Sequence, residues 1–356
     1  MNINSQLASS RTAEGFEEAW RERISSTQFK FFRRLLSQPK AVFGIAIVLV
    51  FVLIAIFAPL IAPGDPNRFV GRPNQPPSAQ FWLGTTGQGQ DVFHQLVWGS
   101  RVSLFIGFTV GFLTTLIGLV VGMTAGYVHG LADGLINMFT NVFLIIPAVP
   151  LLITLASFLP PGTPTVILVL TITGWAWSAR VFRSQTLSLR EKDFVSAAEV
   201  SGERTPYIIF VEILPNMTSL VVSSFFGNVI YAILADAGLA FLGFENVNIA
   251  SWGSMLFWAQ NNSALLQGAW WTFVPPGLCI ALVAFGTTLM IYAMDEITNP
   301  RLRSEKEITS VLKQYHITSR WATPVLRDVP TRPAAVGHPQ LEGGVPDTPR
   351  PGPGSG

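Results

Sequence analysis

The stretch AVFGIAIVLVFVLIAIFAPLIA, from Ala41 to Ala62, decides the fold class, because its 22 residues include no charged side chain. At 1.5 Å per residue, an α-helix of this length is about 33 Å long, enough to cross a hydrocarbon core of about 30 Å. The stretch is too long and too far from the N-terminus for a cleavable signal peptide. The sequence therefore predicts a membrane-spanning helix at this position.

Five further apolar stretches predict five further crossings of a membrane. Only 12% of the 356 residues are charged, whereas a soluble protein carries roughly 25%, and helices buried in a soluble protein would keep a polar stripe. The predicted fold class is therefore all-α, a polytopic membrane protein with six transmembrane helices. The five further stretches are residues 103–127, 134–158, 163–180, 218–244 and 272–294.

Several classes of function have little support in the composition. Lys and Arg total 23 against 21 Asp and Glu, so no basic face for nucleic acid is expected. The four histidines are scattered and Cys279 is the one cysteine, so we expect neither a metal centre nor an intrachain disulfide. None of the five lysines follows a glycine, so the chain has no phosphate-binding loop for ATP. We therefore expect neither an enzyme nor a bound cofactor.

The positions of the basic residues predict the orientation in the membrane. Twenty of the 23 Lys and Arg residues lie in the N-terminal 40 residues, in the connection between the fourth and fifth crossings, or after the sixth crossing. Cytoplasmic segments are enriched in Lys and Arg. Only Arg68, Arg72 and Arg101 fall on the other side. The prediction therefore places both termini in the cytoplasm.

The chain divides into three predicted parts. Residues 1–40 form a cytoplasmic segment with an interfacial helix, because FKFFRRLLSQPK mixes aromatic and basic residues directly before the first crossing. Residues 41–303 form the transmembrane domain. Residues 304–356 form a cytoplasmic tail, rich in Pro and Gly and expected to be disordered. The transmembrane domain has external loops 63–102 and 245–271 and a cytoplasmic loop 181–217.

The cytoplasmic loop carries the most informative local pattern. Small residues, Ser196 to Ala198, end one predicted helix, and Gly202 provides the left-handed conformation that follows a helix C-terminus. A second short helix is predicted from Pro206 to Ile213, ending before Leu214-Pro215. Two such helices would form a compact knob, which could transmit force from a soluble partner to the transmembrane helices.

This loop resembles the "EAA" signature of permease subunits in binding-protein-dependent ABC importers. The matching stretch is DFVSAAEVSGERTPYIIFVEILPN, from Asp193 to Asn216. Ala197, Ala198, Gly202, Leu214 and Pro215 match, whereas Ser196 replaces the usual acidic residue and Glu212 the usual isoleucine. LGTTGQGQDVFHQLVWGSRVSLFIG, AGYVHGLAD, IIPAVPLLI, SWGSML and NPRLR then fall in the order seen in C-type permeases of dipeptide and oligopeptide importers. The resemblance covers about residues 30–303.

The resemblance implies a set of partners and a site. A homologous second permease would complete the pathway, two ATPase subunits would dock at the cytoplasmic face and bind ATP and Mg, and a solute-binding protein would dock outside. The location implied is the cytoplasmic membrane of a prokaryote. The residues implied in ATPase coupling are Asp193, Ser196, Ala197, Ala198, Gly202, Glu212, Leu214 and Pro215.

The cargo and the pathway are open at this stage. Members that carry peptides commonly have an aspartate and an arginine where this chain has Thr86 and Gln90, so oligosaccharides such as cello-oligosaccharides are the alternative to peptides. A secondary transporter is a remote alternative, since such proteins usually show repeats and several buried ionisable groups. Asp236 lies inside the fifth apolar stretch and is predicted either to line the pathway or a gate, or to bond to a neighbouring helix or to the paired subunit.

Overall fold

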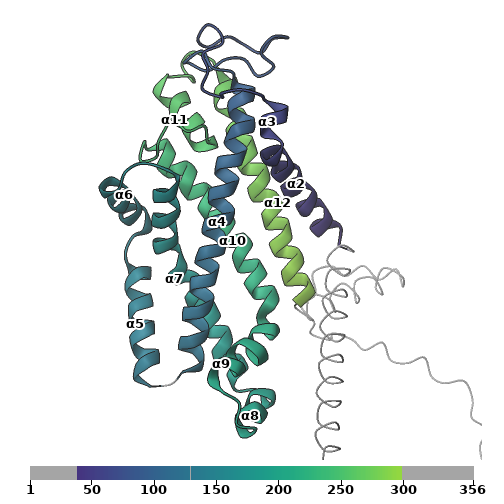
Figure 1. Cartoon of the computed structure of the whole chain (residues 1–356), viewed down its shortest axis with the longest axis vertical. Coiled ribbons are helices and arrows are strands. Elements are labelled where there is room, and N and C mark those ends of the chain that lie inside the picture. The colour runs from purple at the N-terminus through teal and green to yellow at the C-terminus, as the bar shows by residue number, and fades with distance from the viewer. Residues whose placement is uncertain (1–37, 129, 299–356) are drawn as a thin grey trace, which may run out of the picture. The chain divides into compact units, whose positions relative to one another are not determined.

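The computed structural model describes residues 38–128 and 130–298, which form a helical bundle with no β-strand among them (Figure 1). Five of its helices, counted with their short helical extensions, are long and apolar enough to cross a membrane, and a bent pair of shorter helices adds a sixth span if the pair crosses as one. The long helices are α2 (Pro39–Ile56), α4 (Val92–Tyr127), α7 (Thr163–Arg190), α10 (Thr218–Phe241) and α12 (Val274–Thr298). The predicted interfacial helix and the Pro- and Gly-rich tail lie outside the described residues.

The sixth span is bent, whereas the sequence predicted one continuous helix over residues 134–158. Helices α5 (Leu131–Ile145) and α6 (Ala148–Phe158) meet at an angle of 88°. The break falls at Pro147, which has no amide hydrogen to donate to the carbonyl of Phe143. Neither helix alone, at about 22 Å and about 16 Å, is long enough to cross the hydrocarbon core.

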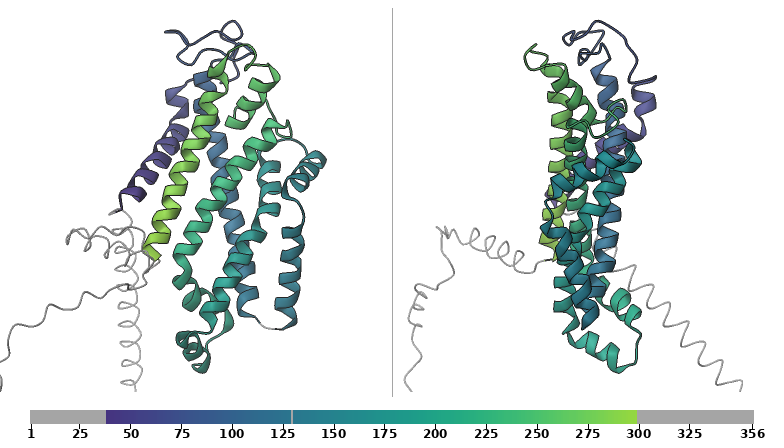
Figure 2. Two further views of the ribbon diagram at one scale, coloured as in Figure 1. Left: turned by 180° about the vertical axis from the view of Figure 1, so that it is seen from behind. Right: turned by 90° about the vertical axis from the view of Figure 1, so that its left-hand side faces the viewer.

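The centre of the bundle is built on α4, which packs most extensively on α7 and then on α10. Figures 1 and 2 show these three helices side by side, with α2 and α12 along one edge and α5 along the other. Glycines at four-residue spacing allow the contact: a Cβ atom on Gly122 would lie 2.4 Å from the carbonyl oxygen of Ala179, and one on Gly118 would lie 2.6 Å from Cβ of Ser178. Small residues in such a row let two helix backbones approach closely.

The two ends of the bundle differ in structure (Figure 1). We call the end that carries α11 the α11 end, and the opposite end, which carries α8 (Asp193–Val200), the α8 end. The α11 end contains α3 (Ala58–Ile61), residues 63–91 and α11 (Trp252–Asn261). The predicted external loop 63–102 is shorter than expected, because α4 already begins at Val92, where the Asp91 side chain accepts a hydrogen bond of 2.8 Å from the Phe93 amide. The α4 helix of 36 residues is therefore about 54 Å long and extends well beyond a hydrocarbon core.

Helix α11 closes this end and packs on α4 and α10. Trp252 is fully buried, and its indole nitrogen donates to the Leu96 carbonyl at 3.2 Å, while its backbone amide donates to Ser103 Oγ at 3.1 Å. Trp258 and Trp271 also donate their indole N–H groups to main-chain carbonyls. Three of the four tryptophans in residues 252–271 thus connect the loops at this end by hydrogen bonds.

The glycine contact between α4 and α7 gives a direct prediction. Gly122→Ala places a methyl group against the α7 backbone, and overpacking of this kind costs about 1–3 kcal/mol. We expect a lower Tm and a lower yield of the purified protein. Gly277→Ala on α12 is the control, because a Cβ there meets nothing within 4 Å. Equal Tm values for the two variants would contradict the close α4–α7 contact.

Candidate functional site

The signature residues form a small helical projection at the end of the bundle opposite α11 (Figures 1 and 2). We call residues 193–217 the α8 knob. Its first helix, α8 (Asp193–Val200), ends where Gly202 takes a φ of +79°. The Gly202 amide donates to the Glu199 carbonyl and the Glu203 amide to the Ala198 carbonyl, which is the pattern of a Schellman C-cap. The prediction of left-handed geometry at Gly202 is confirmed.

The second half of the α8 knob differs from the prediction of a helix that stops before Leu214-Pro215. The chain turns through α9 (Thr205–Tyr207), a π-helical turn η1 (Ile208–Ile213) and a 3₁₀ turn η2 (Leu214–Met217), and then enters α10 without a break. Pro215 removes one helical donor, and the wider and tighter turns on either side accommodate this loss within a continuous path. The knob is therefore continuous with α10.

Apolar packing fixes the knob to the bundle. Val195 of α8 is fully buried, in a cluster that joins residues of α4 and α7 to the turns before α10. The cluster contains Leu119, Met123, Phe182, Val195, Ile208, Ile209, Ile213 and Met217. Burial of a valine-sized side chain contributes roughly 1.5–3 kcal/mol, so these contacts hold α8 against the transmembrane helices.

Polar contacts add to this attachment. The Tyr127 hydroxyl, at the end of α4, donates to Glu199 Oε1 of α8 at 2.8 Å. The Arg190 guanidinium, at the end of α7, donates to the carbonyls of Gly126 and Tyr127 at 3.1 and 3.3 Å. Sequence reasoning missed these residues because the Tyr127–Glu199 partners are 72 positions apart and neither belongs to a recognisable pattern.

The predicted coupling residues differ in how far they are exposed to solvent. Ser196, Ala197 and Gly202 are exposed, and Val200 beside them is 90% exposed, so the outer face of α8 is small and partly apolar. Asp193 (first turn of α8) and Pro215 (η2) are also exposed, Ala198 and Glu212 are half-buried, and Leu214 packs on the buried cluster. Their roles in coupling stay predictions.

Asp236 lies on α10 near the α11 end and is 1% exposed. Its carboxyl group is near that of Glu245, which is 3% exposed, and the two would repel each other if both were ionised. None of the four carboxyl oxygens has a hydrogen-bond partner among the residues that the structure describes. Sequence reasoning missed Glu245, which follows the apolar stretch directly. The role of Asp236 in a pathway or gate stays a prediction.

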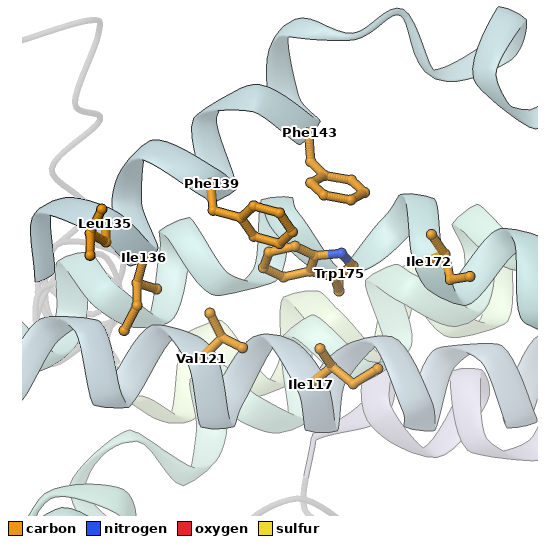
Figure 3. A pocket seen from close by; sticks show the side chains of 8 residues that line it. All are labelled: Ile117, Val121, Leu135, Ile136, Phe139, Phe143, Ile172 and Trp175. Carbon is orange, nitrogen blue, oxygen red and sulfur yellow. The ribbon is translucent and has the colours of Figure 1, made fainter. Parts of the chain in front are cut away.

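Two hollows lie alongside α7, with opposite chemistry. The first, which we call the apolar groove, has a volume of about 600 Å³ and is enclosed by α4, α5 and α7 (Figure 3). Phe139 and Phe143 project from α5 toward Trp175 of α7, with ring centroids 6.0 and 5.2 Å from the tryptophan. Its lining residues are Ile117, Val121, Leu135, Ile136, Phe139, Phe143, Ile172 and Trp175.

The second hollow, the polar cavity, has a volume of about 770 Å³ and lies between the α5–α6 bend, α7, α10 and α12. Hydroxyl and amide groups face it from two helices. These groups belong to Thr173, Ser178, Ser223, Ser224, Asn228 and Tyr231. The apolar groove offers only the indole N–H of Trp175, whereas the polar cavity offers several hydroxyl and amide groups to a polar solute.

This architecture defines a polytopic helical membrane protein with an anchored helical knob at one end. The chain belongs to the family of binding-protein-dependent transport system inner membrane components, which it matches over residues 118–304. Residues 27–77 match the N-terminal transmembrane domain of oligopeptide transport permease C. It is accordingly a transporter subunit of the permease class.

Named relatives cover most of the chain. The dipeptide transport system permease protein DppC of Alkalihalophilus pseudofirmus is 32% identical over 280 residues, covering 77% of this chain and 90% of that protein. The oligopeptide transport system permease protein OppC of Bacillus subtilis is 31% identical over 288 residues, covering 79% and 93%. A chain of the MetNI methionine ABC transporter, solved in inward-facing conformations, is 20% identical with a TM-score of 0.46, covering 57% of this chain and 94% of that chain.

The buried acidic pair predicts a dependence of stability on pH. Burial raises the pKa of Glu245 from 4.5 to about 7, although the nearby Ser251 hydroxyl partly lowers it. The folded protein therefore binds more protons than the unfolded chain between about pH 4.5 and pH 7, so the free energy of unfolding falls as the pH rises through this range.

The measurement is Tm in detergent at pH 5 and pH 8. We expect wild-type Tm to fall between these values, and Glu245→Gln to reduce the fall because glutamine does not ionise. Glu203→Gln, at an exposed position of the α8 knob, is the matched control and should keep the wild-type profile. An unchanged fall in Glu245→Gln would show that another group is responsible.

Proposed function

We propose that this chain is the permease subunit of an ATP-driven importer of dipeptides or oligopeptides, and that the α8 knob couples it to an ATPase. The observation that carries the proposal is the attachment of α8 to α4 and α7, through buried Val195 and the Tyr127–Glu199 hydrogen bond. A docked ATPase can move transmembrane helices only through an element that is rigidly attached to them and moves with them. The names of the relatives support the peptide cargo.

Movement of α8 would reach the opposite end of the bundle through α4. Tyr127 lies at one end of this helix, and Gly99 and Ser103 near the other end contact Trp252 of α11. The close glycine contact with α7 makes the two helices move together. Closure of the ATPases on ATP would thus switch the pathway between inward- and outward-facing states, a two-state change biased by nucleotide.

The proposal assigns the remaining components to other chains. A homologous second permease completes the pathway, two ATPase subunits bind ATP and Mg and hydrolyse ATP, and a solute-binding protein delivers the cargo at the α11 end. The end of the bundle that carries α8 faces the cytoplasm, both termini are cytoplasmic, and the subunit resides in the cytoplasmic membrane of a prokaryote. The basic residues of α7 and the α8 knob support this orientation.

The loop that raised the oligosaccharide alternative has a structural explanation. The Thr86 amide donates to the Gln90 carbonyl at 2.8 Å, and Gln95 Nε2 donates to Gln90 Oε1 at 2.6 Å. Thr86 is buried, and its hydroxyl accepts from the Gln90 amide at 3.2 Å. The two neutral residues hold the loop itself together, so their presence is not evidence for a neutral cargo, and peptides are the favoured class.

Docking at the α8 knob is tested by Ala197→Arg and Gly202→Val. The first adds bulk and charge to the exposed outer face of α8, and the second strains a left-handed backbone at a cost of about 1–2 kcal/mol. We expect both variants to lose the co-purifying ATPase and peptide uptake. Ala79→Arg, at an exposed alanine of the opposite end, should retain the ATPase. Unchanged co-purification and uptake in both knob variants would refute the assignment.

Transmission is tested separately by Tyr127→Phe, which removes the hydroxyl that bonds to Glu199. Since a hydrogen bond contributes roughly 0.5–1.5 kcal/mol, we expect peptide uptake per ATP to fall about two- to tenfold. The ATPase should still co-purify. The matched control is Tyr292→Phe, at an exposed tyrosine of α12. Wild-type uptake per ATP in Tyr127→Phe would exclude this contact from coupling.

A further inference from the structure

The polar cavity lies where the bundle has a broken backbone. Residues 143–148, which include the end of α5, the bend and the start of α6, form one of its walls. The last carbonyls of any α-helix lack helical donors, and here Pro147 removes one further donor. In lipid such groups would be unsatisfied, so irregular backbone at membrane depth is found where it is buried in protein or lines a water-filled cavity.

The opposite wall offers side-chain groups of the same kind. Asn228 of α10 is buried, and its Nδ2 donates to Thr115 Oγ1 and to Ser178 Oγ, both at 2.9 Å, while its Oδ1 lies 3.3 Å from Ser178 Oγ. Both amide hydrogens are therefore used within the protein, and the amide oxygen keeps one acceptor position. These bonds fix the orientation of the amide at the cavity wall. Ser223, Ser224 and Tyr231 on the same helix add hydroxyl groups. Donors and acceptors thus line a continuous strip of α10.

The charge of the lining identifies the chemistry of a solute. Asp295 is the one ionisable carboxylate among the lining residues, and it accepts a hydrogen bond of 3.2 Å from Ser223 Oγ near the α8 end. The rest of the lining is neutral, and beside the hydroxyl and amide groups it includes apolar side chains such as Leu144, Ile146 and Ile291. A fixed wall of neutral donors and acceptors complements amide groups, which a peptide main chain presents at every residue whatever its side chains.

We propose that the polar cavity is this subunit's share of the substrate path, filled with water at rest, and that the amide oxygen of Asn228 and the neighbouring hydroxyls bind the main-chain amides of the passing peptide. The inference rests on the proposed function and names the residues that contact its cargo. The volume, about 770 Å³, lies within the 300–1,000 Å³ that is typical of small-molecule sites. The apolar groove of similar volume provides an internal comparison, since it offers no hydroxyl or amide side chain.

Hydration of the cavity is tested by cysteine labelling, for which the chain is well suited because Cys279 is its one cysteine. In a Cys279→Ala background, Ser224→Cys places a thiol in the polar cavity and Val121→Cys places one in the apolar groove. Each variant is reconstituted as the full importer in liposomes and treated with a charged, water-soluble methanethiosulfonate. Thiols react as thiolates, which form in water and not in an apolar environment.

We expect Ser224→Cys to react about tenfold faster than Val121→Cys, because only the polar cavity admits water. Turnover with a tripeptide and ATP should slow this reaction, since the peptide occupies the same space. Equal rates for the two cysteines, or a rate at Ser224→Cys that peptide leaves unchanged, would overturn the proposal.

Recognition of the peptide is tested by Asn228→Leu, which keeps a similar volume and removes the amide. Loss of one hydrogen bond predicts about a fivefold fall in tripeptide uptake. Thr287→Val is the control: this buried hydroxyl bonds only within α12, to the carbonyls of Val283 and Ala284, and the variant should transport normally.

The outcomes separate the two proposals. A wild-type importer that takes up no peptide would refute the proposed function. Normal wild-type uptake, together with normal uptake by Asn228→Leu, would refute the assignment of the cavity. If Asn228→Leu fails to assemble, Ser224→Ala serves in its place, with a fall in uptake expected and wild-type uptake contradicting the proposal.

Discussion

The lack of hydrogen-bond partners for the backbone in lipid is the constraint on which the rest of the structure depends. It requires helices throughout the spans, and it leaves few places where the chain can deviate from them. The α5–α6 bend at Pro147 is one such deviation, and the polar cavity lies directly against it. The need to satisfy backbone hydrogen bonds in lipid therefore determines the helical fold and also indicates where a polar solute can bind.

Close packing turns these helices into a unit that can transmit movement. The glycine row of α4 brings its backbone against α7, while Val195 and Tyr127 join both helices to the α8 knob. By contrast α5 packs less extensively on its neighbours, and in its first turn it is held by a bidentate ion pair in which Arg183 donates to Asp133 at 2.8 Å. The bundle thus combines a firm centre with a peripheral bent span.

The sequence predicted what depends on periodicity and composition, and missed what depends on contacts between distant residues. Apolar stretches located the five long helices and the bent pair of α5 and α6, and Gly202 correctly predicted the end of α8. The prediction was wrong at two prolines: it expected a continuous helix through Pro147, where the chain bends, and a helix end before Pro215, where the path continues. A proline specifies only that one hydrogen-bond donor is missing. Whether the chain bends sharply or adjusts its helical turns is decided by what packs around it, here the buried side chains of Ile208, Ile213 and Met217.

Asp236 illustrates the same limit for a functional residue. Asp236 was predicted either to line the pathway or a gate, or to bond to a neighbouring helix or to the paired subunit; it is buried, and its carboxyl oxygens have no hydrogen-bond partner among the residues that the structure describes. Its neighbour Glu245 lies only nine positions further on, yet nothing in the pattern shows that the chain folds back to bring the two together. The hydroxyls and the amide of the polar cavity gave still less signal, because single Ser, Thr and Asn residues are common in transmembrane helices. What distinguishes them is their convergence from α7 and α10 on one hollow, because Thr173 also bonds within its own helix, as Thr287 does.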